Sequence, residues 1–211
     1  MNNITVVNNN YNQLCQTPCD INEHLPTLSK YASECDSVLE LGVRGCVSSW
    51  AFANGLLSNK SNTTTKKLFL NDIESCDINH LIHFTKNTNL SIDYKWCNDL
   101  DLDTTDKTFD IVFIDTWHVY GQLKRELDKF SKVTNKFIIM HDTTVDAIYG
   151  ETIRLNLNTK QQSIATNIPE DEILKGLEPA IDEFLLNNKN WSIREKYENN
   201  NGLTILQRID V

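Results

Sequence analysis

The stretch Ser37-Val38-Leu39-Glu40-Leu41-Gly42-Val43-Arg44-Gly45 decides how this chain folds. Residues 37–41 form a short apolar run, and an apolar helical segment follows at residues 47–57. A short apolar strand that turns through glycines into a helix is typical of the first unit of an open α/β sheet. The glycines allow the backbone to approach a ligand closely at this turn.

Strand and helix patterns alternate along most of the chain. A helix is expected from Asp20, because Asp20 and Glu23 have the spacing of a capping pair and apolar residues follow at helical spacing. Residues 109–115 are nearly all apolar or β-branched, as in a strand covered on both faces. We expect further strands at 68–70, 91–96 and 136–140, and helices at 77–86 and 121–133.

The C-terminal part has a different pattern. A loop is expected at 143–168, then a helix at 169–187, and Asn201-Gly202 separates two alternating runs at 191–197 and 203–208, which indicates a β-hairpin. The predicted fold class is α/β. It is a Rossmann-like, mostly parallel seven-stranded sheet with helices on both faces and a C-terminal antiparallel hairpin.

Composition indicates one globular domain. The chain has 211 residues, of which 40% are hydrophobic and 23% charged, as in soluble globular proteins. Residues 1–19 are rich in Asn, Gln and Thr, so we expect a flexible N-terminal arm followed by one domain at 20–211.

Charge and cysteine content narrow the function. The formal net charge of −9 disfavours nucleic acid as a partner. No apolar run is long enough to span a bilayer and the N-terminus does not resemble a signal peptide, so we expect a cytoplasmic protein without a membrane partner. The six cysteines form no C-x-x-C pair, which favours reduced thiols.

Polar residues follow the first three strands, where ligands of open α/β sheets bind. Glu40 suits a ligand with an ammonium group, Asp72 can accept hydrogen bonds from ribose hydroxyls, and Asp99 can meet an adenine amino group. Arg44 occupies the place of the second glycine of a G-x-G-x-x-G motif, which disfavours a dinucleotide. One such acid is as often a loop former as a ligand. Three acidic residues at the ends of successive strands favour a ligand-binding site.

The next two strands end in Asp115-Thr116-Trp117-His118 and His141-Asp142-Thr143. These carboxylates and imidazoles should converge, because the two strands are neighbours in a doubly wound sheet. Such a cluster can bind a divalent cation or deprotonate a hydroxyl group. His118 is the candidate base. In the alternative interpretation, His118 caps the following helix and His141 packs against the sheet.

With these residues, the sequence resembles class I S-adenosylmethionine (SAM)-dependent methyltransferases. It is similar to the group that includes cephalosporin hydroxylase-like proteins and macrocin-type sugar O-methyltransferases, from about Asp20 to Arg208. The most specific motifs are Asp20-Ile21-Asn22-Glu23-His24-Leu25-Pro26, Glu40-Leu41-Gly42-Val43-Arg44, Phe113-Ile114-Asp115-Thr116-Trp117-His118, His141-Asp142-Thr143 and Asn200-Asn201-Gly202-Leu203-Thr204.

The resemblance implies a cofactor site, a metal site and a catalytic base. SAM would contact Glu40, Gly42, Arg44, Asp72, Asp99 and Asp115. In the sugar O-methyltransferases, an Asp after the fourth strand and an acidic pair after the fifth hold magnesium, and a His three residues after the first Asp is the base. Asp115, His118 and Asp142 match this pattern, whereas His141 replaces the first acid of the pair. A site of Asp115, His141 and Asp142 would bind magnesium weakly, bind a softer ion such as manganese, or use no metal.

The implied function is methyl transfer from SAM to a hydroxyl of a sugar, a glycan or another small hydroxylated acceptor. The 143–168 loop would cover the acceptor. One alternative is a non-catalytic SAM-fold module beside glycan-modifying enzymes. A nucleotide-dependent oxidoreductase is a third hypothesis, which Arg44 and the terminal hairpin disfavour. The sequence leaves open whether the chain forms a homo-oligomer.

Overall fold

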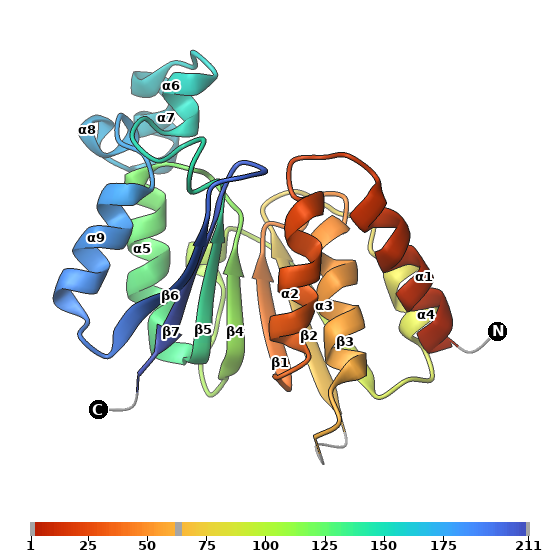
Figure 1. Ribbon diagram of the computed structural model, residues 1–211. Helices are drawn as coiled ribbons and strands as arrows, with labels where there is room; N and C mark the ends of the chain where they lie inside the picture. Colours follow the sequence, from red (N-terminus) through yellow and green to blue (C-terminus); the bar gives the residue numbers. More distant parts are fainter. Residues whose placement is uncertain (1–2, 62–64, 210–211) are drawn as a thin grey trace.

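The computed structural model describes residues 3–61 and 65–209. Within these residues, seven strands form one sheet in the order β3-β2-β1-β4-β5-β7-β6 (Figure 1). The first five strands are parallel to one another, whereas β7 is antiparallel to both β5 and β6. The strands are β1 (Ser37–Leu41), β2 (Lys66–Asp72), β3 (Leu90–Trp96), β4 (Phe109–Ile114), β5 (Thr134–His141), β6 (Trp191–Tyr197) and β7 (Leu203–Arg208). The predicted fold class is confirmed.

Helices cover both faces of this sheet (Figure 1). Helices α1 to α4 pack over one face, and α5 and α9 pack over the other. The α-helices are α1 (Asn3–Gln16), α2 (Leu25–Ala32), α3 (Val47–Ser58), α4 (Asn79–Thr85), α5 (Tyr120–Phe130), α6 (Glu151–Arg154), α7 (Thr159–Thr166), α8 (Glu170–Ile173) and α9 (Glu178–Asn187). Short 3-10 turns are η1 (Asn22–His24), η2 (Asp99–Asp101) and η3 (Ser131–Val133).

The core has two parts, because successive side chains of a strand point to opposite faces of the sheet. Val38 of β1 and Phe113 of β4 pack beneath α2 and α3. Leu39 and Ile114, one residue further along the same strands, pack beneath α5 and α9. The central strands are therefore apolar on both sides, as their sequences predict.

The N-terminal segment differs from the expected flexible arm. Residues 3–16 form helix α1, in which Val7 is buried and Tyr11 and Leu14 pack against the same core. These apolar residues recur at helical spacing between asparagines, so the helix docks through one narrow stripe. Asp20 caps no helix, and its carboxylate instead lies 3.7 Å from Arg44 Nη1.

The segment 143–177, which we call the cap, differs from the expected loop and long helix. It contains α6, α7 and α8 and lies above α5 and α9 in Figure 1. The expected helix at 169–187 is interrupted before α9. A Cβ on Gly176 would overlap the backbone oxygens of Asp146 and Ala147, so this position needs glycine in the tight crossing of two loops.

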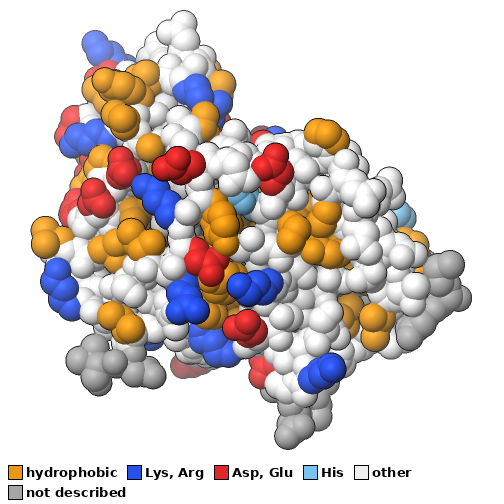
Figure 2. Space-filling model, viewed as in Figure 1, with side chains coloured by type: hydrophobic (Ala, Val, Ile, Leu, Met, Phe, Trp, Pro, Cys, Tyr) orange, Lys and Arg blue, Asp and Glu red, His pale blue; other side chains and the backbone are white. Residues whose placement is uncertain are grey.

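The surface is mixed in charge. On the face shown in Figure 2, acidic and basic side chains are interspersed, and hydrophobic side chains reach the surface over the cap. Exposed apolar residues of the cap include Ile148, Tyr149 and Ile164. None of the helices that the structure describes combines the length and apolar character needed to cross a bilayer.

Candidate active site

A cavity of about 570 Å³ opens at the C-terminal ends of the parallel strands. This volume is typical of small-molecule sites. Its wall contains six of the residues singled out in the sequence, namely Gly42, Arg44, Asp72, Asp99, Asp115 and His118. Trp117, Glu151, Thr166 and Ile168 also line it, the last three from the cap. Glu40, His141 and Asp142 are not part of this wall.

The turn after β1 requires glycine. Gly42 has φ +87°, and a Cβ at this position would overlap the backbone oxygen of Asp115 at the end of β4. Arg44 also has a positive φ of 42°. Gly45, by contrast, has open space where its Cβ would lie. The Gly42 turn therefore lies directly against β4, at the floor of the cavity.

The Asp72 carboxylate holds this turn in place. Its Oδ2 accepts hydrogen bonds from the backbone N–H groups of Val43 at 2.8 Å and Arg44 at 2.9 Å, and its Oδ1 accepts one from Glu74 at 2.8 Å. Burial opposes ionisation, but these backbone donors lower the pKa of Asp72 below its ordinary value. Asp72 is thus an ionised acceptor at the cavity wall, and it also shapes the neighbouring turn.

Glu40 lies behind the turn and not in the cavity. Its side chain is fully buried on the α3 side of β1, where Oε1 accepts a hydrogen bond from Ser48 Oγ at 2.5 Å. Burial raises the pKa of Glu40 to about 8, although hydrogen bonds from Ser48 and Ser49 lower it. In this structure Glu40 therefore contacts α3 and does not line the cavity.

Asp99 follows β3 and reaches the cavity from η2. Its side chain is largely buried, and its Oδ1 accepts a hydrogen bond from Gln122 Nε2 of α5 at 3.1 Å. Gln122 also lines the cavity. The three strand ends predicted to gather around a ligand thus contribute Gly42, Asp72 and Asp99 to one wall, while Glu40 supports that wall from behind.

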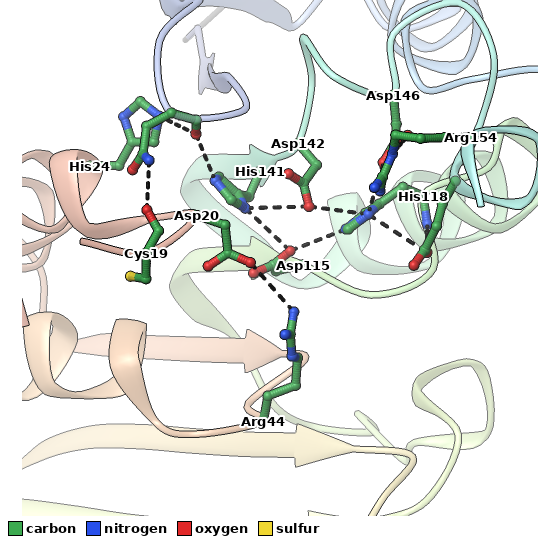
Figure 3. Close-up of polar contacts among 12 residues, drawn as sticks. Cys19, Asp20, His24, Arg44, Asp115, His118, His141, Asp142, Asp146 and Arg154 are labelled. Carbon is green, nitrogen blue, oxygen red and sulfur yellow. Dashed lines mark hydrogen bonds and ion pairs between the residues drawn. The ribbon is translucent and has the colours of Figure 1, made fainter. Parts of the chain in front are cut away.

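At the other end of the cavity, carboxylates surround His118 (Figure 3). His118 Nε2 lies 3.1 Å from Asp115 Oδ1, and Nδ1 lies 3.1 Å from Asp142 Oδ2 and 3.3 Å from Asp146 Oδ2. Glu151 of the cap is slightly further, at 3.8 Å. The ring is thereby fixed between the ends of β4 and β5 and the cap.

These contacts set the charge of the cluster. Burial alone would lower the pKa of His118, but hydrogen bonds to Asp115 and Asp146 and the nearby negative charges raise it well above its ordinary value. Burial likewise opposes ionisation of Asp115, but His118 and His141 hold its pKa below the ordinary range. Without a bound cation, His118 is therefore an imidazolium between carboxylates.

His141 is held from the opposite side. Its Nε2 donates to the backbone oxygen of Asn200 at 3.2 Å, in the turn between β6 and β7. Its Nδ1 lies 3.5 Å from Asp115 Oδ1 and 3.6 Å from Asp142 Oδ2. His24, which is also buried, donates to Asn199 and Asn200 beside it. His141 thus orients the two aspartates from beneath.

The donor set fits a divalent cation. Among the described residues, one ligand atom from each of Asp115, His118 and Asp142 lies within 4.8 Å of the other two. Asp142 Oδ1 is buried with no hydrogen-bond partner in this part of the chain. The resemblance implied His141 in this group in place of His118, and His141 Nδ1 also lies 3.5 Å from Asp115 Oδ1 and 3.6 Å from Asp142 Oδ2. Two carboxylates and an imidazole suit manganese or zinc better than magnesium, which prefers oxygen ligands.

Asp146 and Arg154 were missed in the sequence. Asp146 is fully buried and forms a bidentate pair with Arg154 of α6, at 2.7 and 2.8 Å, while its Oδ2 also faces His118. Trp117 Nε1 donates to Thr152 Oγ1 of α6 at 3.2 Å. The cap is therefore bound to the residues around His118. Nothing in the local sequence marks Asp146 as buried.

The fold, but not the sequence, is similar to that of known proteins. No protein-family model matches the sequence, and no curated protein matches it. A structure described as a putative caffeoyl-CoA O-methyltransferase from Staphylococcus aureus aligns over 97% of this chain and 91% of its own, with 14% identity and a TM-score of 0.61. The O-methyltransferase TomG from Streptomyces achromogenes, in complex with SAM, aligns over 100% and 91%, with 11% identity and a TM-score of 0.57.

A third structure is an O-methyltransferase from Bacillus cereus in complex with SAH. It aligns over 88% of this chain and 80% of its own, with 12% identity and a TM-score of 0.55. These similarities show that the chain has the Rossmann-like fold of methyltransferases. At such low identity, what a protein binds must be argued from its own residues.

Proposed function

We propose that this protein is a SAM-dependent O-methyltransferase. The observation that carries the proposal is that one cavity wall joins the Gly42 turn, Asp72 and Asp99 at one end to Asp115 and His118 at the other. The first group has the chemistry to bind a nucleoside, and the second has the chemistry to act on a hydroxyl group.

The cavity residues fit the parts of SAM. Gly42 lines the cavity and has no side chain, so the methionine part of SAM can approach the backbone closely there. Asp72 is ionised and can accept hydrogen bonds from ribose hydroxyls on its remaining lone pairs. Asp99 and Leu100 lie where an adenine ring would meet an acceptor and an apolar surface. Glu40 has no direct contact in this assignment.

The residues at the other end prepare the acceptor. Bound SAM supplies a sulfonium methyl group, which is an electrophile. An alcohol is a weak nucleophile, so a base must take its proton as the oxygen attacks. His118 is positioned for this role at the cavity wall, with Asp146 fixing its ring. As an imidazolium it must first lose its own proton.

A divalent cation at Asp115 and Asp142 would supply the positive charge that favours neutral His118 and would lower the pKa of the acceptor hydroxyl. We assign the acceptor to sugars, glycans or other small hydroxylated molecules, which the cap covers with Glu151, Thr166 and Ile168.

The experiment is a methyl-transfer screen with SAM labelled in its methyl group. Free sugars, nucleotide-linked sugars and small phenols serve as acceptors, each with EDTA, manganese or magnesium. Label in a base-stable ether product, dependent on the enzyme, supports the proposal. SAM binding without transfer to any acceptor would favour a non-catalytic module, and transfer to an amine or thiol in place of a hydroxyl would contradict O-methylation.

A further inference from the structure

One polar face of α5 is directed at η2. Gln122, Glu126 and Lys129 are four and three residues apart, so they share one side of the helix. Gln122 and Glu126 are only 7% and 1% exposed. Helix positions that face inward normally carry apolar side chains, and a buried carboxyl group is costly unless it is hydrogen-bonded. Packing alone does not explain this face.

All three side chains hold the loop that carries Asp99. Gln122 Nε2 donates to Asp99 Oδ1 at 3.1 Å and to Glu126 Oε1 at 2.9 Å. Lys129 Nζ donates to the backbone oxygens of Asp99 and Leu100 at 2.8 Å and of Leu102 at 2.7 Å. The α5 helix thus fixes both the backbone of η2 and the side chain of Asp99.

Two oxygen atoms in this cluster have no donor. Glu126 Oε1 accepts from Thr116 Oγ1 and Gln122, but Glu126 Oε2 and Asp99 Oδ2 are buried without a hydrogen-bond partner among the described residues. The two carboxyl groups lie side by side, because the same Gln122 Nε2 atom is 3.1 Å from Asp99 Oδ1 and 2.9 Å from Glu126 Oε1. Two buried carboxylates this close do not both ionise, and one shared proton satisfies both orphaned oxygens.

The proton belongs mainly to Glu126. Burial and the negative charge of Asp99 raise the pKa of Glu126 well above its ordinary value. Burial raises the pKa of Asp99 too, but the hydrogen bond from Glu126, the Leu100 N–H and the positive charge of Lys129 oppose that rise. This assignment agrees with the geometry, since Glu126 faces only its neighbours while Asp99 reaches the cavity.

We propose that Glu126 is a neutral positioning residue, which donates a hydrogen bond to Asp99 and fixes the Asp99 carboxylate as an acceptor for the amino group of adenine. The inference rests on the proposed function, because it assumes a SAM-like nucleoside in the cavity. With Gln122 and Glu126 both donating to it, Asp99 can only accept. The cavity should therefore select adenine, whose amino group donates, over hypoxanthine, whose oxygen at the same position accepts.

Calorimetric titration with S-adenosylhomocysteine (SAH) and S-inosylhomocysteine tests this inference. Wild-type protein should prefer SAH by at least about 100-fold, because hypoxanthine leaves a buried acceptor unpaired. Glu126→Gln keeps an oxygen for Thr116 and Gln122 and an N–H for Asp99, so its affinity should stay within about threefold of wild type. Glu126→Leu removes both, and should weaken SAH binding by about 10- to 100-fold and reduce the preference.

Asp128→Leu is the matched control, since Asp128 is an exposed acid on the same helix. It should bind both compounds as wild type does. If Glu126→Gln loses as much affinity as Glu126→Leu, then Glu126 acts as an anion and the inference is wrong. Unchanged binding by Glu126→Leu would also overturn it.

Asp99→Asn provides a second variant that does not depend on the folding of Glu126→Leu. It places an N–H₂ group where Asp99 has an acceptor, so the preference for adenine over hypoxanthine should fall by about tenfold or more. An unchanged preference overturns the inference. If wild-type protein binds neither nucleoside, the proposed function fails and the inference fails with it, whereas SAH binding without base selectivity contradicts the inference alone.

Discussion

His118 Nε2 lies 3.1 Å from Asp115 Oδ1, and this contact joins the end of β4 to the residue that leads into α5. The two residues lie between the part of the cavity proposed for SAM and the part proposed for the acceptor. Asp115 belongs both to the wall beside the Gly42 turn and to the carboxylate cluster. His118 stands between that wall and the cap, where an acceptor hydroxyl would enter.

Replacing the His118 ring should remove catalysis and spare the cofactor. For His118→Ala we expect methyl transfer to fall by roughly 10²- to 10⁴-fold, the usual contribution of a general base. SAH affinity should remain within about threefold, because Asp72 and Asp99 are untouched. Rates and calorimetric titrations measure the two effects, with His83→Ala as control, since His83 is exposed on α4. An active His118→Ala enzyme would remove this residue from the mechanism.

Adding one methyl group at Gly42 should disrupt the site. The new Cβ in Gly42→Ala would overlap the Asp115 backbone oxygen, and the φ of +87° is unfavourable for alanine. We expect a loss of about 1–3 kcal/mol in the free energy of unfolding and weaker SAH binding. Gly45→Ala, three residues away, meets nothing within 4 Å and should behave as wild type. Equal behaviour of the two variants in urea unfolding would contradict the packing of this turn.

Breaking the Asp146–Arg154 pair should loosen the cap. Arg154→Ala leaves the fully buried Asp146 carboxylate without its bidentate partner, so we expect about 1–3 kcal/mol of destabilisation. Lys196→Ala breaks the exposed pair with Glu178 and should cost at most about 1 kcal/mol. Urea unfolding of both variants provides the comparison. If Arg154→Ala costs no more than Lys196→Ala, the cap does not depend on this pair.

The buried Glu40 should make stability fall as pH rises. Its folded-state pKa of about 8 exceeds the ordinary 4.5, so between these values the folded protein binds more protons than the unfolded chain. The contribution of Glu40 to the free energy of unfolding is complete below about pH 4.5. It is lost as the pH rises towards 8, by up to about 1.4 kcal/mol per pH unit. Glu40→Gln removes this titration.

Urea unfolding between pH 5.5 and 7.5 measures the difference between wild type and Glu40→Gln. The advantage of wild type over the variant should shrink as pH rises. Parallel stability curves for the two proteins would mean that Glu40 is ionised in the folded state.

The strands of the sheet were predictable from the sequence. The face of the sheet to which each side chain points was harder to predict. The bounds of β1 and of both hairpin strands match the expected ones, because each is a short alternating or apolar run bounded by turn residues. The same alternation could have placed Glu40 beside Val38 on the α3 face, away from the cavity. Its position immediately before the glycines suggested a ligand contact instead.

Elements that depend on tertiary contacts were harder to predict. Helix α1 packs against the core through a few apolar residues among asparagines, and none of the described residues of α7 is buried. Neither helix therefore shows a strong helical periodicity of apolar residues in its sequence. Asp146 and Glu126 are buried acids whose partners Arg154 and Asp99 belong to other elements, α6 and η2. Only the folded chain brings Arg154 and Asp99 to them.

The proposed function requires that the cavity lined by Gly42, Asp72, Asp99 and Asp115 binds the nucleoside of SAM. Calorimetric titration of the wild-type protein with SAH tests it most directly, with NAD as the competing ligand. We expect saturable binding of one SAH per chain, weakened in Gly42→Ala but not in Gly45→Ala, and no heat with NAD. Saturable binding of NAD with no response to SAH would contradict it.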